Sequence, residues 1–224
     1  MNHRKVVIAG ASGLVGSSLL QGLLDDASVA EVHALGRREP TVRHPKLAAH
    51  CVDFSALPAL PAVDEVYLAL GTTMKQAGSA EAFRAVDFDA NLAVARAAMA
   101  AGARRIGLVS AMGANVRSAV FYNRVKGELE AALDALKPET CVVARPSLLV
   151  GDREALNQPS RGGEKWGIRI GRLLGSLAPL NYRPVEARRV AWALLSTVPV
   201  LRGKRVLTSG DIQQFTSRAG PANA

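Results

Sequence analysis

The sequence predicts an α/β fold, in which helices cover both faces of a doubly wound parallel sheet. Three observations lead to this expectation. Short apolar runs alternate with amphipathic stretches along most of the chain. The apolar runs are continuous, as in strands that are buried on both faces. The first run leads through a glycine-rich turn into a helix, and a sheet of this kind binds its ligand at the carboxyl ends of its strands.

The length of 224 residues suits one such domain with a core of its own. We expect a single domain over residues 1–224. Residues 151–184 are rich in glycine, arginine and proline, and they predict a small C-terminal segment on the substrate side, or a lid. Residues 219–224 predict a frayed tail.

The first half of the chain supplies four expected strands and one helix. Each strand is a short apolar run that ends at a glycine or near an aspartate, whereas the helix has apolar residues at helical spacing. The strands are expected at Lys5–Ala9, Glu31–Leu35, Ala49–Val52 and Val66–Leu70, and the helix at Leu14–Leu24.

The second half continues the alternation with longer helices. Ser79 is a suitable N-cap for a helix that continues to about Ala101, and Pro138 ends the next helix. Helices are expected at Ser79–Ala101, Ala119–Leu136, Lys165–Leu177 and Val185–Thr197, and strands at Arg105–Val109, Thr140–Ala144 and Arg205–Thr208.

The glycine-rich turn, Gly10 to Gly16, has the spacing GxxGxxG. Glycines let a backbone turn tightly and approach phosphate groups, and the following helix offers N–H groups and a positive dipole end. The turn therefore predicts a site for the pyrophosphate of a dinucleotide. The alternative is an ordinary turn between a strand and a helix.

The end of the second expected strand offers Arg37 and Arg38 and no carboxylate. A carboxylate would repel a 2′-phosphate, whereas a guanidinium can bind it through two hydrogen bonds. This favours NADP over NAD, unless both arginines face solvent. Asp53 could accept a hydrogen bond from the adenine amino group, and Gly71 would let the backbone pass close to the nicotinamide ribose.

Ser110, Tyr122 and Lys126 form the candidate catalytic set. Tyr122 and Lys126 are four residues apart, so they share one face of a helix. A nearby ammonium favours the tyrosinate, which suits a group that exchanges a proton with a substrate oxygen. Ser110 ends the preceding strand and could hold the same oxygen. The alternative is a surface lysine one turn from a packed tyrosine.

These motifs resemble the extended and atypical short-chain dehydrogenases/reductases. The residues Leu70-Gly-Thr-Thr, Lys75-Gln-Ala-Gly and Tyr122-Asn-Arg-Val-Lys-Gly-Glu128 are similar to the HIV-Tat-interacting oxidoreductase family. The resemblance spans about Lys5 to Leu207 and implies a Rossmann-like fold that binds NADPH, with Ser110, Tyr122 and Lys126 as the catalytic triad. It places at the cofactor Gly10, Ser12, Gly13, Leu14, Val15, Gly16, Arg37, Arg38, Asp53, Phe54, Leu70, Gly71, Thr72, Tyr122, Lys126, Arg145 and Pro146.

Two features depart from that resemblance. Many extended members have an asparagine in the long helix where Asp87 falls here, and the segment after Gly151 is short for a nucleotide-sugar site. The expected function is an NADP(H)-dependent oxidoreductase that acts on a small carbonyl compound or alcohol. Two alternatives stay open: an NADPH-binding sensor or protein-interaction module without turnover, and an enzyme like a nucleotide-sugar epimerase.

Composition narrows the partners. The net charge is +9, but the basic residues are scattered without interleaved aromatic residues, so we expect no nucleic-acid partner. The histidines lack metal-ligand spacing, and we expect no metal. Cys51 and Cys141 lie in apolar runs and are expected to be buried free thiols. Neither a signal peptide nor a membrane span is expected, which predicts a cytoplasmic protein. A homodimer or a protein partner stays open.

The segment Glu164 to Leu177 carries an apolar stripe within the region expected to flank the substrate. We expect either a helix packed on the domain or a mobile lid over the substrate.

Overall fold

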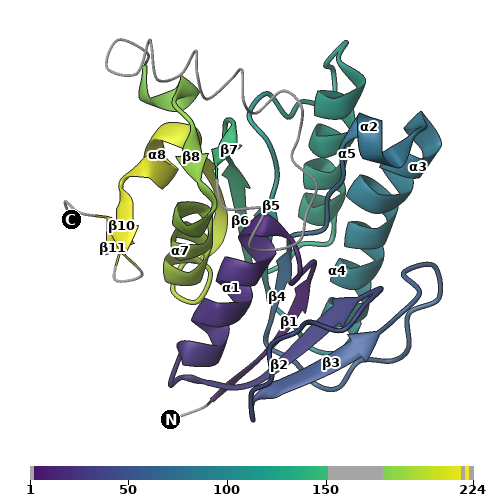
Figure 1. The fold of residues 1–224 in the computed structure, drawn as a ribbon, viewed down its shortest axis with the longest axis vertical. Helices are drawn as coiled ribbons and strands as arrows, with labels where there is room; N and C mark the ends of the chain where they lie inside the picture. The colour runs from purple at the N-terminus through teal and green to yellow at the C-terminus, as the bar shows by residue number, and fades with distance from the viewer. Residues whose placement is uncertain (1–2, 151–178, 218–219, 222–224) are drawn as a thin grey trace.

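The computed structural model describes residues 3–150, 179–217 and 220–221. Its centre is a seven-stranded sheet in the order β3-β2-β1-β4-β5-β6-β9, in which all neighbouring strands are parallel (Figure 1). The expected doubly wound sheet is therefore confirmed. The seven strands are β1 (Arg4–Ala9), β2 (Val29–Gly36), β3 (Leu47–Cys51), β4 (Glu65–Leu68), β5 (Arg105–Val109), β6 (Thr140–Arg145) and β9 (Gly203–Thr208).

The order of the strands reverses between β1 and β4. From β1 the chain moves outward through β2 to β3, returns to the other side of β1 at β4, and then moves outward again. Loops on the two sides of such a reversal diverge, and they leave a crevice at the carboxyl ends of the strands.

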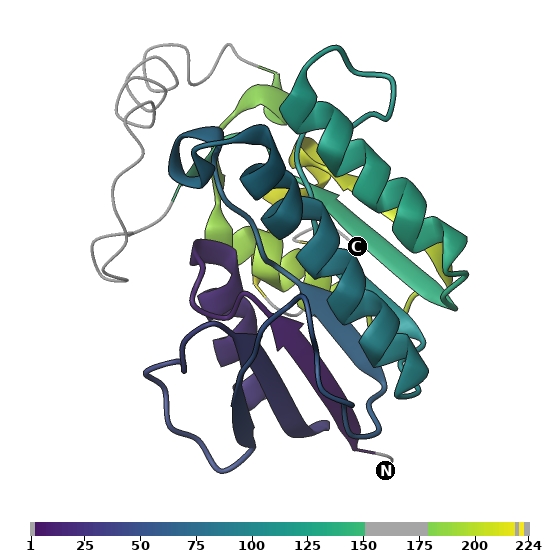
Figure 2. The same cartoon turned by 90° about the vertical axis from the view of Figure 1, so that its right-hand side faces the viewer.

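Helices pack on both faces of the sheet: α1 and α7 lie on one side of the strands in Figure 1 and α4 and α5 on the other, and Figure 2 looks onto the side of α4 and α5. On one face, α1 and α7 bury their apolar residues against β1 and β6. On the other, α4 packs over β1 and β4, and α5 packs over β6. The helices of the described residues are α1 (Leu14–Asp25), α2 (Met74–Ala77), α3 (Ala80–Arg84), α4 (Asn91–Ala100), α5 (Phe121–Ala135), α7 (Ala187–Thr197) and α8 (Ser209–Gln213).

The long helix expected from Ser79 to Ala101 is interrupted by a π-helical turn. Ser79 caps it as expected, because its hydroxyl accepts a hydrogen bond from the Ala82 N–H. The π-helix η1 (Ala85–Ala90) then separates α3 from α4. The Asn91 side-chain amide donates to the carbonyl oxygens of Val86 and Asp87, at 3.2 and 3.3 Å, and stabilises the widened turn. Turns of this kind often mark functional sites in α-helices.

Several short elements were not expected, because each is too short for a periodic pattern. They are α2, α8, β7 (Leu149–Val150), β8 (Val185–Glu186), η2 (Leu180–Tyr182), β10 (Phe215–Ser217) and β11 (Gly220–Pro221). The expected helix at Lys165–Leu177 lies outside the described residues, as does most of the segment 151–184. One expectation was wrong: Cys51 is exposed, since it stands at the end of the edge strand β3, whereas Cys141 is buried in central β6.

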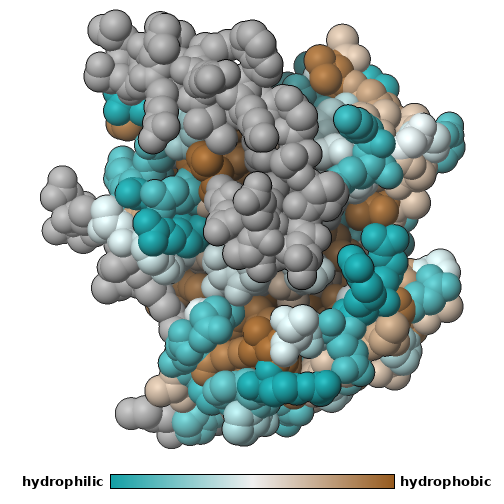
Figure 3. All heavy atoms as spheres, viewed as in Figure 1, coloured by the Kyte–Doolittle hydropathy of each residue, from teal (hydrophilic) through white to brown (hydrophobic). Residues whose placement is uncertain are grey.

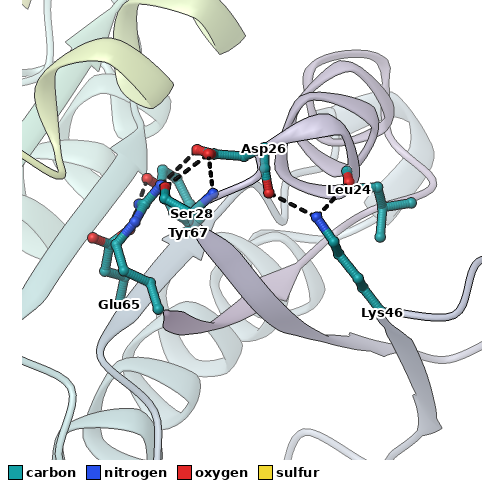
Figure 4. A network of polar contacts seen from close by, with 7 residues as sticks. Leu24, Asp26, Ser28, Lys46, Glu65 and Tyr67 are labelled. Atoms are coloured by element: carbon teal, nitrogen blue, oxygen red, sulfur yellow. Dashed lines mark hydrogen bonds and ion pairs between the residues drawn. The ribbon is translucent and has the colours of Figure 1, made fainter. Parts of the chain in front are cut away.

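A network of charges holds the amino ends of the strands together (Figure 4). The Arg4 guanidinium donates to Glu65 Oε2 and Asp26 Oδ2, both at 2.6 Å, and the Tyr67 hydroxyl donates to the same Glu65 oxygen at 3.1 Å. Lys46 donates to the carbonyl oxygens that end α1. Burial raises the pKa of Glu65 even beside Arg4. The network joins β1, β4 and the end of α1 at the edge opposite the crevice.

Candidate functional site

The turn between β1 and α1 is built so closely that only glycine fits at two of its positions. Gly10 has a φ of +88°, and a Cβ there would lie 2.5 Å from the Ala69 carbonyl oxygen. A Cβ on Gly16 would lie 1.9 Å from the Gly10 carbonyl oxygen. Gly13, the N-cap of α1, provides no side-chain cap, and the first turn holds no acidic residue. The helix therefore presents its N–H groups and positive dipole end to a ligand.

An open cleft of about 1440 Å³ follows the carboxyl ends of β2, β1, β4 and β5. This is more than a drug-sized pocket occupies, and it suits an extended ligand. Seen from the side of Figure 1, the surface is mostly hydrophilic, with hydrophobic residues visible in hollows between polar ones (Figure 3). The cleft is lined by most of the expected site residues: Gly10, Ser12, Gly13, Leu14, Val15, Arg37, Arg38, Asp53, Phe54, Leu70, Gly71, Thr72, Ser110, Tyr122 and Lys126.

Three expected cofactor residues are not among those that line the cleft. Gly16 lies behind the turn, where it lets α1 pack against Gly10. The Pro146 carbonyl accepts a hydrogen bond from the Met112 N–H and so fixes the loop after β5. Arg145 forms an ion pair with Glu130 of α5 and does not line the cleft.

The β2 end of the cleft carries positive charge. Arg37 and Arg38 are exposed, and within the described part of the chain their guanidinium groups make no hydrogen bond or ion pair. Asp53 lies at the same end, after β3. Its Oδ1 accepts hydrogen bonds from the N–H and the hydroxyl of Ser55, at 2.9 and 2.8 Å. These bonds lower the pKa of Asp53 below its usual range.

The α5 end of the cleft holds Tyr122 and Lys126. Tyr122 packs against Phe83, with ring centroids 5.5 Å apart, and its hydroxyl makes no hydrogen bond to the described residues. The Lys126 ammonium lies 2.7 Å from Asp87 Oδ1. The other oxygen of Asp87 accepts the Thr72 N–H at 2.8 Å. The ammonium that was expected beside Tyr122 therefore has a buried counter-ion.

Ser110 belongs to a second buried group. Its hydroxyl lies 2.5 Å from Glu130 Oε1, and Arg145 donates to both oxygens of the same carboxylate, at 3.0 and 2.5 Å. In this contact the Ser110 hydroxyl is the donor and Glu130 Oε1 is the acceptor. Ser110 therefore presents only lone pairs to any further partner.

Sequence reasoning missed Glu130 and assigned no role to Asp87. A signal for Glu130 exists, since it lies four residues after Lys126 and eight after Tyr122, on one face of α5. The long helix does contain a buried asparagine, but it is Asn91, one turn after Asp87. Its amide nitrogen also donates to the Leu70 carbonyl at 3.2 Å, which links the π-helix to the end of β4.

Within the described ranges, no group of three histidine, cysteine, aspartate or glutamate side chains has the arrangement of a metal site. Among the helices described there, none has the length and apolar composition that crossing a bilayer requires.

Solved structures of related fold include nucleotide-dependent enzymes. A UDP-N-acetylglucosamine 4-epimerase from Methanobrevibacter ruminantium superposes with a TM-score of 0.68 at 17% identity, over 93% of this chain and 77% of its own. MoeE5, in complex with UDP-glucose and NAD, gives a TM-score of 0.66 at 19% identity, over 91% and 75% of the two chains. At these identities the likeness shows the fold, which is that of Rossmann dehydrogenases.

Curated relatives are closer in sequence. HTATIP2 of Rattus norvegicus is 35% identical over 92% of this chain and 81% of its own length, which confirms the resemblance drawn from the motifs. The protein FMP52 of Eremothecium gossypii is 39% identical over 84% of this chain and 87% of its own.

The expectation of a cytoplasmic protein is contradicted by these relatives, because several FMP52 proteins are named mitochondrial. The model of a family described as NAD(P)H-binding matches residues 10–145, which include the glycine turn, both arginines after β2 and the α5 residues of the cleft. The chain belongs to this NAD(P)H-binding family.

Proposed function

We propose that the protein is an NADP(H)-dependent oxidoreductase that reduces a small carbonyl compound or oxidises the corresponding alcohol. The observation that carries this proposal is the free Tyr122 hydroxyl. It lies in the cleft that begins at the glycine turn, one helical turn from a buried lysine. A positioned hydroxyl with no partner in the described structure suits a group that exchanges a proton with a ligand.

The residues of the cleft fit a dinucleotide along its whole length. Gly10 and Gly13 let a pyrophosphate approach the N-terminus of α1. Arg37 and Arg38 suit the 2′-phosphate of NADP, since neither guanidinium is held by a carboxylate of the described chain. Asp53 and Phe54 suit the adenine, and Gly71 and Thr72 suit the nicotinamide ribose. We therefore assign NADP(H) rather than NAD(H).

The chemistry that a bound NADPH supplies is the donation of a hydride to a carbonyl carbon. The carbonyl oxygen then needs one proton, and Tyr122 donates it. Ser110 serves as a hydrogen-bond acceptor at this point, because its own proton is directed to Glu130. It can therefore accept from the Tyr122 hydroxyl or from the hydroxyl of an alcohol, whereas the sequence suggests only that it holds the substrate oxygen.

A second candidate is an NADPH-binding sensor without turnover. Two of the expected catalytic groups already have partners within the protein, since Lys126 pairs with Asp87 and Ser110 with Glu130. This favours the alternative without turnover. Under this alternative Tyr122 contributes only packing against Phe83.

Steady-state oxidation of NADPH against a panel of carbonyl compounds separates the two functions. We expect turnover with at least one compound, and a fall of about 10²–10⁴-fold in Tyr122→Phe, the usual range for a positioned acid. NADPH affinity and folding should be nearly unchanged, because one hydroxyl is removed. Tyr182→Phe is the matched control, since Tyr182 is exposed and outside the cleft lining.

Equal rates for wild type and Tyr122→Phe would remove Tyr122 from the mechanism. NADPH binding with no turnover across the panel would favour the sensor.

A further inference from the structure

Asp87 and Lys126 form a buried ion pair that borders the cleft. Their side chains are 1% and 5% exposed, yet both residues line the cleft. A buried charge is costly unless it is paired, so the two groups depend on each other. The pair brings together η1 and α5, and Asp87 Oδ2 also holds the Thr72 N–H after β4.

The backbone leaves this pair close to whatever occupies the cleft. A Cβ on Gly71 would lie 3.5 Å from Asp87 Oδ1 and 3.9 Å from the Lys126 ammonium, so the backbone of Gly71 borders the ion pair. The contact between Oδ1 and the ammonium has the distance of an ion pair but not the angle of a hydrogen bond. The pair thus acts chiefly through its charges.

The cleft has a direction if the proposed cofactor occupies it. Arg37 and Arg38 mark the adenosine end, and the glycine turn marks the pyrophosphate. The nicotinamide end then lies beyond the turn, on the side of β4, β5 and α5, where Asp87 and Lys126 are. The nicotinamide ring is positively charged when oxidised and neutral when reduced. A lone buried ammonium would therefore disfavour the oxidised form.

We propose that Asp87 determines redox-state specificity: it cancels the charge of Lys126, so that the cleft binds NADP⁺ as well as NADPH. The inference rests on the proposed cofactor. Without Asp87, the buried Lys126 ammonium would be an uncompensated positive charge at the end of the cleft that the oxidised ring would occupy. At the effective dielectric constant of a protein site, repulsion between this charge and the oxidised ring should weaken NADP⁺ binding at least about tenfold. Without Lys126, the Asp87 carboxylate would attract the oxidised ring instead.

Calorimetric titration with NADP⁺ and with NADPH tests this, and the readout is the ratio of the two dissociation constants. Asp87→Asn should raise the NADP⁺ constant about tenfold relative to the NADPH constant. Lys126→Met should move the ratio in the opposite direction, although both affinities fall. The double variant should return the ratio toward that of the wild type.

Asp89→Asn is the matched control. It makes the same change on the same π-helix and along the same cleft, but Asp89 is exposed to solvent, and its ratio should stay within about twofold of the wild type.

The inference is overturned if the wild type binds both nucleotides while Asp87→Asn and Lys126→Met leave the ratio within about twofold, or move it in the same direction. Lys126→Met decides the matter alone if Asp87→Asn does not fold. A wild type that binds neither nucleotide overturns the proposed function, and the inference with it.

Discussion

The two edges of the sheet use polar groups in different ways. At the amino ends of the strands, Arg4 is held by Glu65 and Asp26, and Tyr67 by Glu65. At the carboxyl ends, the Tyr122 hydroxyl and the Arg37 guanidinium have no hydrogen-bond partner among the described residues. Groups that bind one another stabilise the fold, whereas groups without partners are available to a ligand. The amino-end network is thus internally paired, whereas Tyr122 and Arg37 leave polar groups open toward the cleft.

The largest effect on stability is expected from Arg4→Met, which keeps the length of the side chain and removes its charge. The Glu65 side chain is fully buried and would lose its counter-ion, so the free energy of unfolding should fall by about 3–5 kcal/mol. Chemical denaturation measures this. NADPH affinity should not change, because Arg4 is at the edge opposite the cleft.

The same variant has a pH dependence of known sign. Burial already raises the pKa of Glu65, and the loss of Arg4 raises it further. A raised carboxyl pKa stabilises the protein at low pH, and this contribution is lost as the pH rises through the folded-state value. The loss of unfolding free energy caused by Arg4→Met should therefore be smaller at a pH of about 5 than at about 7.5.

Lys5→Met is the control for Arg4→Met, because Lys5 is next to it on β1 and forms an exposed ion pair with Glu31. Such pairs contribute about 0–1 kcal/mol. If Lys5→Met lowers the free energy of unfolding as much as Arg4→Met does, the amino-end network is not what stabilises this edge of the sheet.

Arg37→Ala should have effects opposite to those of Arg4→Met: it should change stability little but weaken cofactor binding. A charge-assisted hydrogen bond to a 2′-phosphate contributes roughly 1.5–3 kcal/mol, or about one to two decades in the dissociation constant of NADPH. NADH affinity should not change, because it lacks the phosphate. Arg43→Ala is the control, since Arg43 is exposed nearby but outside the cleft. An equal loss for both nucleotides would place Arg37 elsewhere on the cofactor.

The smallest effect is expected from thiol labelling, which compares the reactivity of Cys51 on the edge strand β3 with that of Cys141 on the central strand β6. Burial raises the pKa of the Cys141 thiol to about 11, so little reactive thiolate forms there at neutral pH. Cys51 is exposed and lines the cleft. Reaction of the folded protein with a chromogenic disulfide should release one equivalent rapidly, and NADPH should slow it. Cys51→Ser should abolish this fast phase, whereas fast labelling of both thiols would contradict the described burial.

The sequence predicts this fold well because its strands are continuous apolar runs and its first turn needs glycine at Gly10. These are local signals. The π-helix was not predictable in the same way, because it depends on the Asn91 amide reaching carbonyl groups of its own helix. The partners of the candidate catalytic set are tertiary contacts: Asp87 meets Lys126 across two helices, and Ser110 meets Glu130 twenty residues later. Residue types and spacing identified the side chains, but not the charges that surround them.

We propose that the cleft at the carboxyl ends of the strands binds NADP(H), with its 2′-phosphate at Arg37 and Arg38. Calorimetric titration of the wild-type protein with NADPH and with NADH tests it most directly. We expect both to bind, with NADPH tighter by about one to two decades, because only NADPH can engage the two free guanidinium groups. Equal affinities for the two cofactors, or no binding of either, would contradict the account.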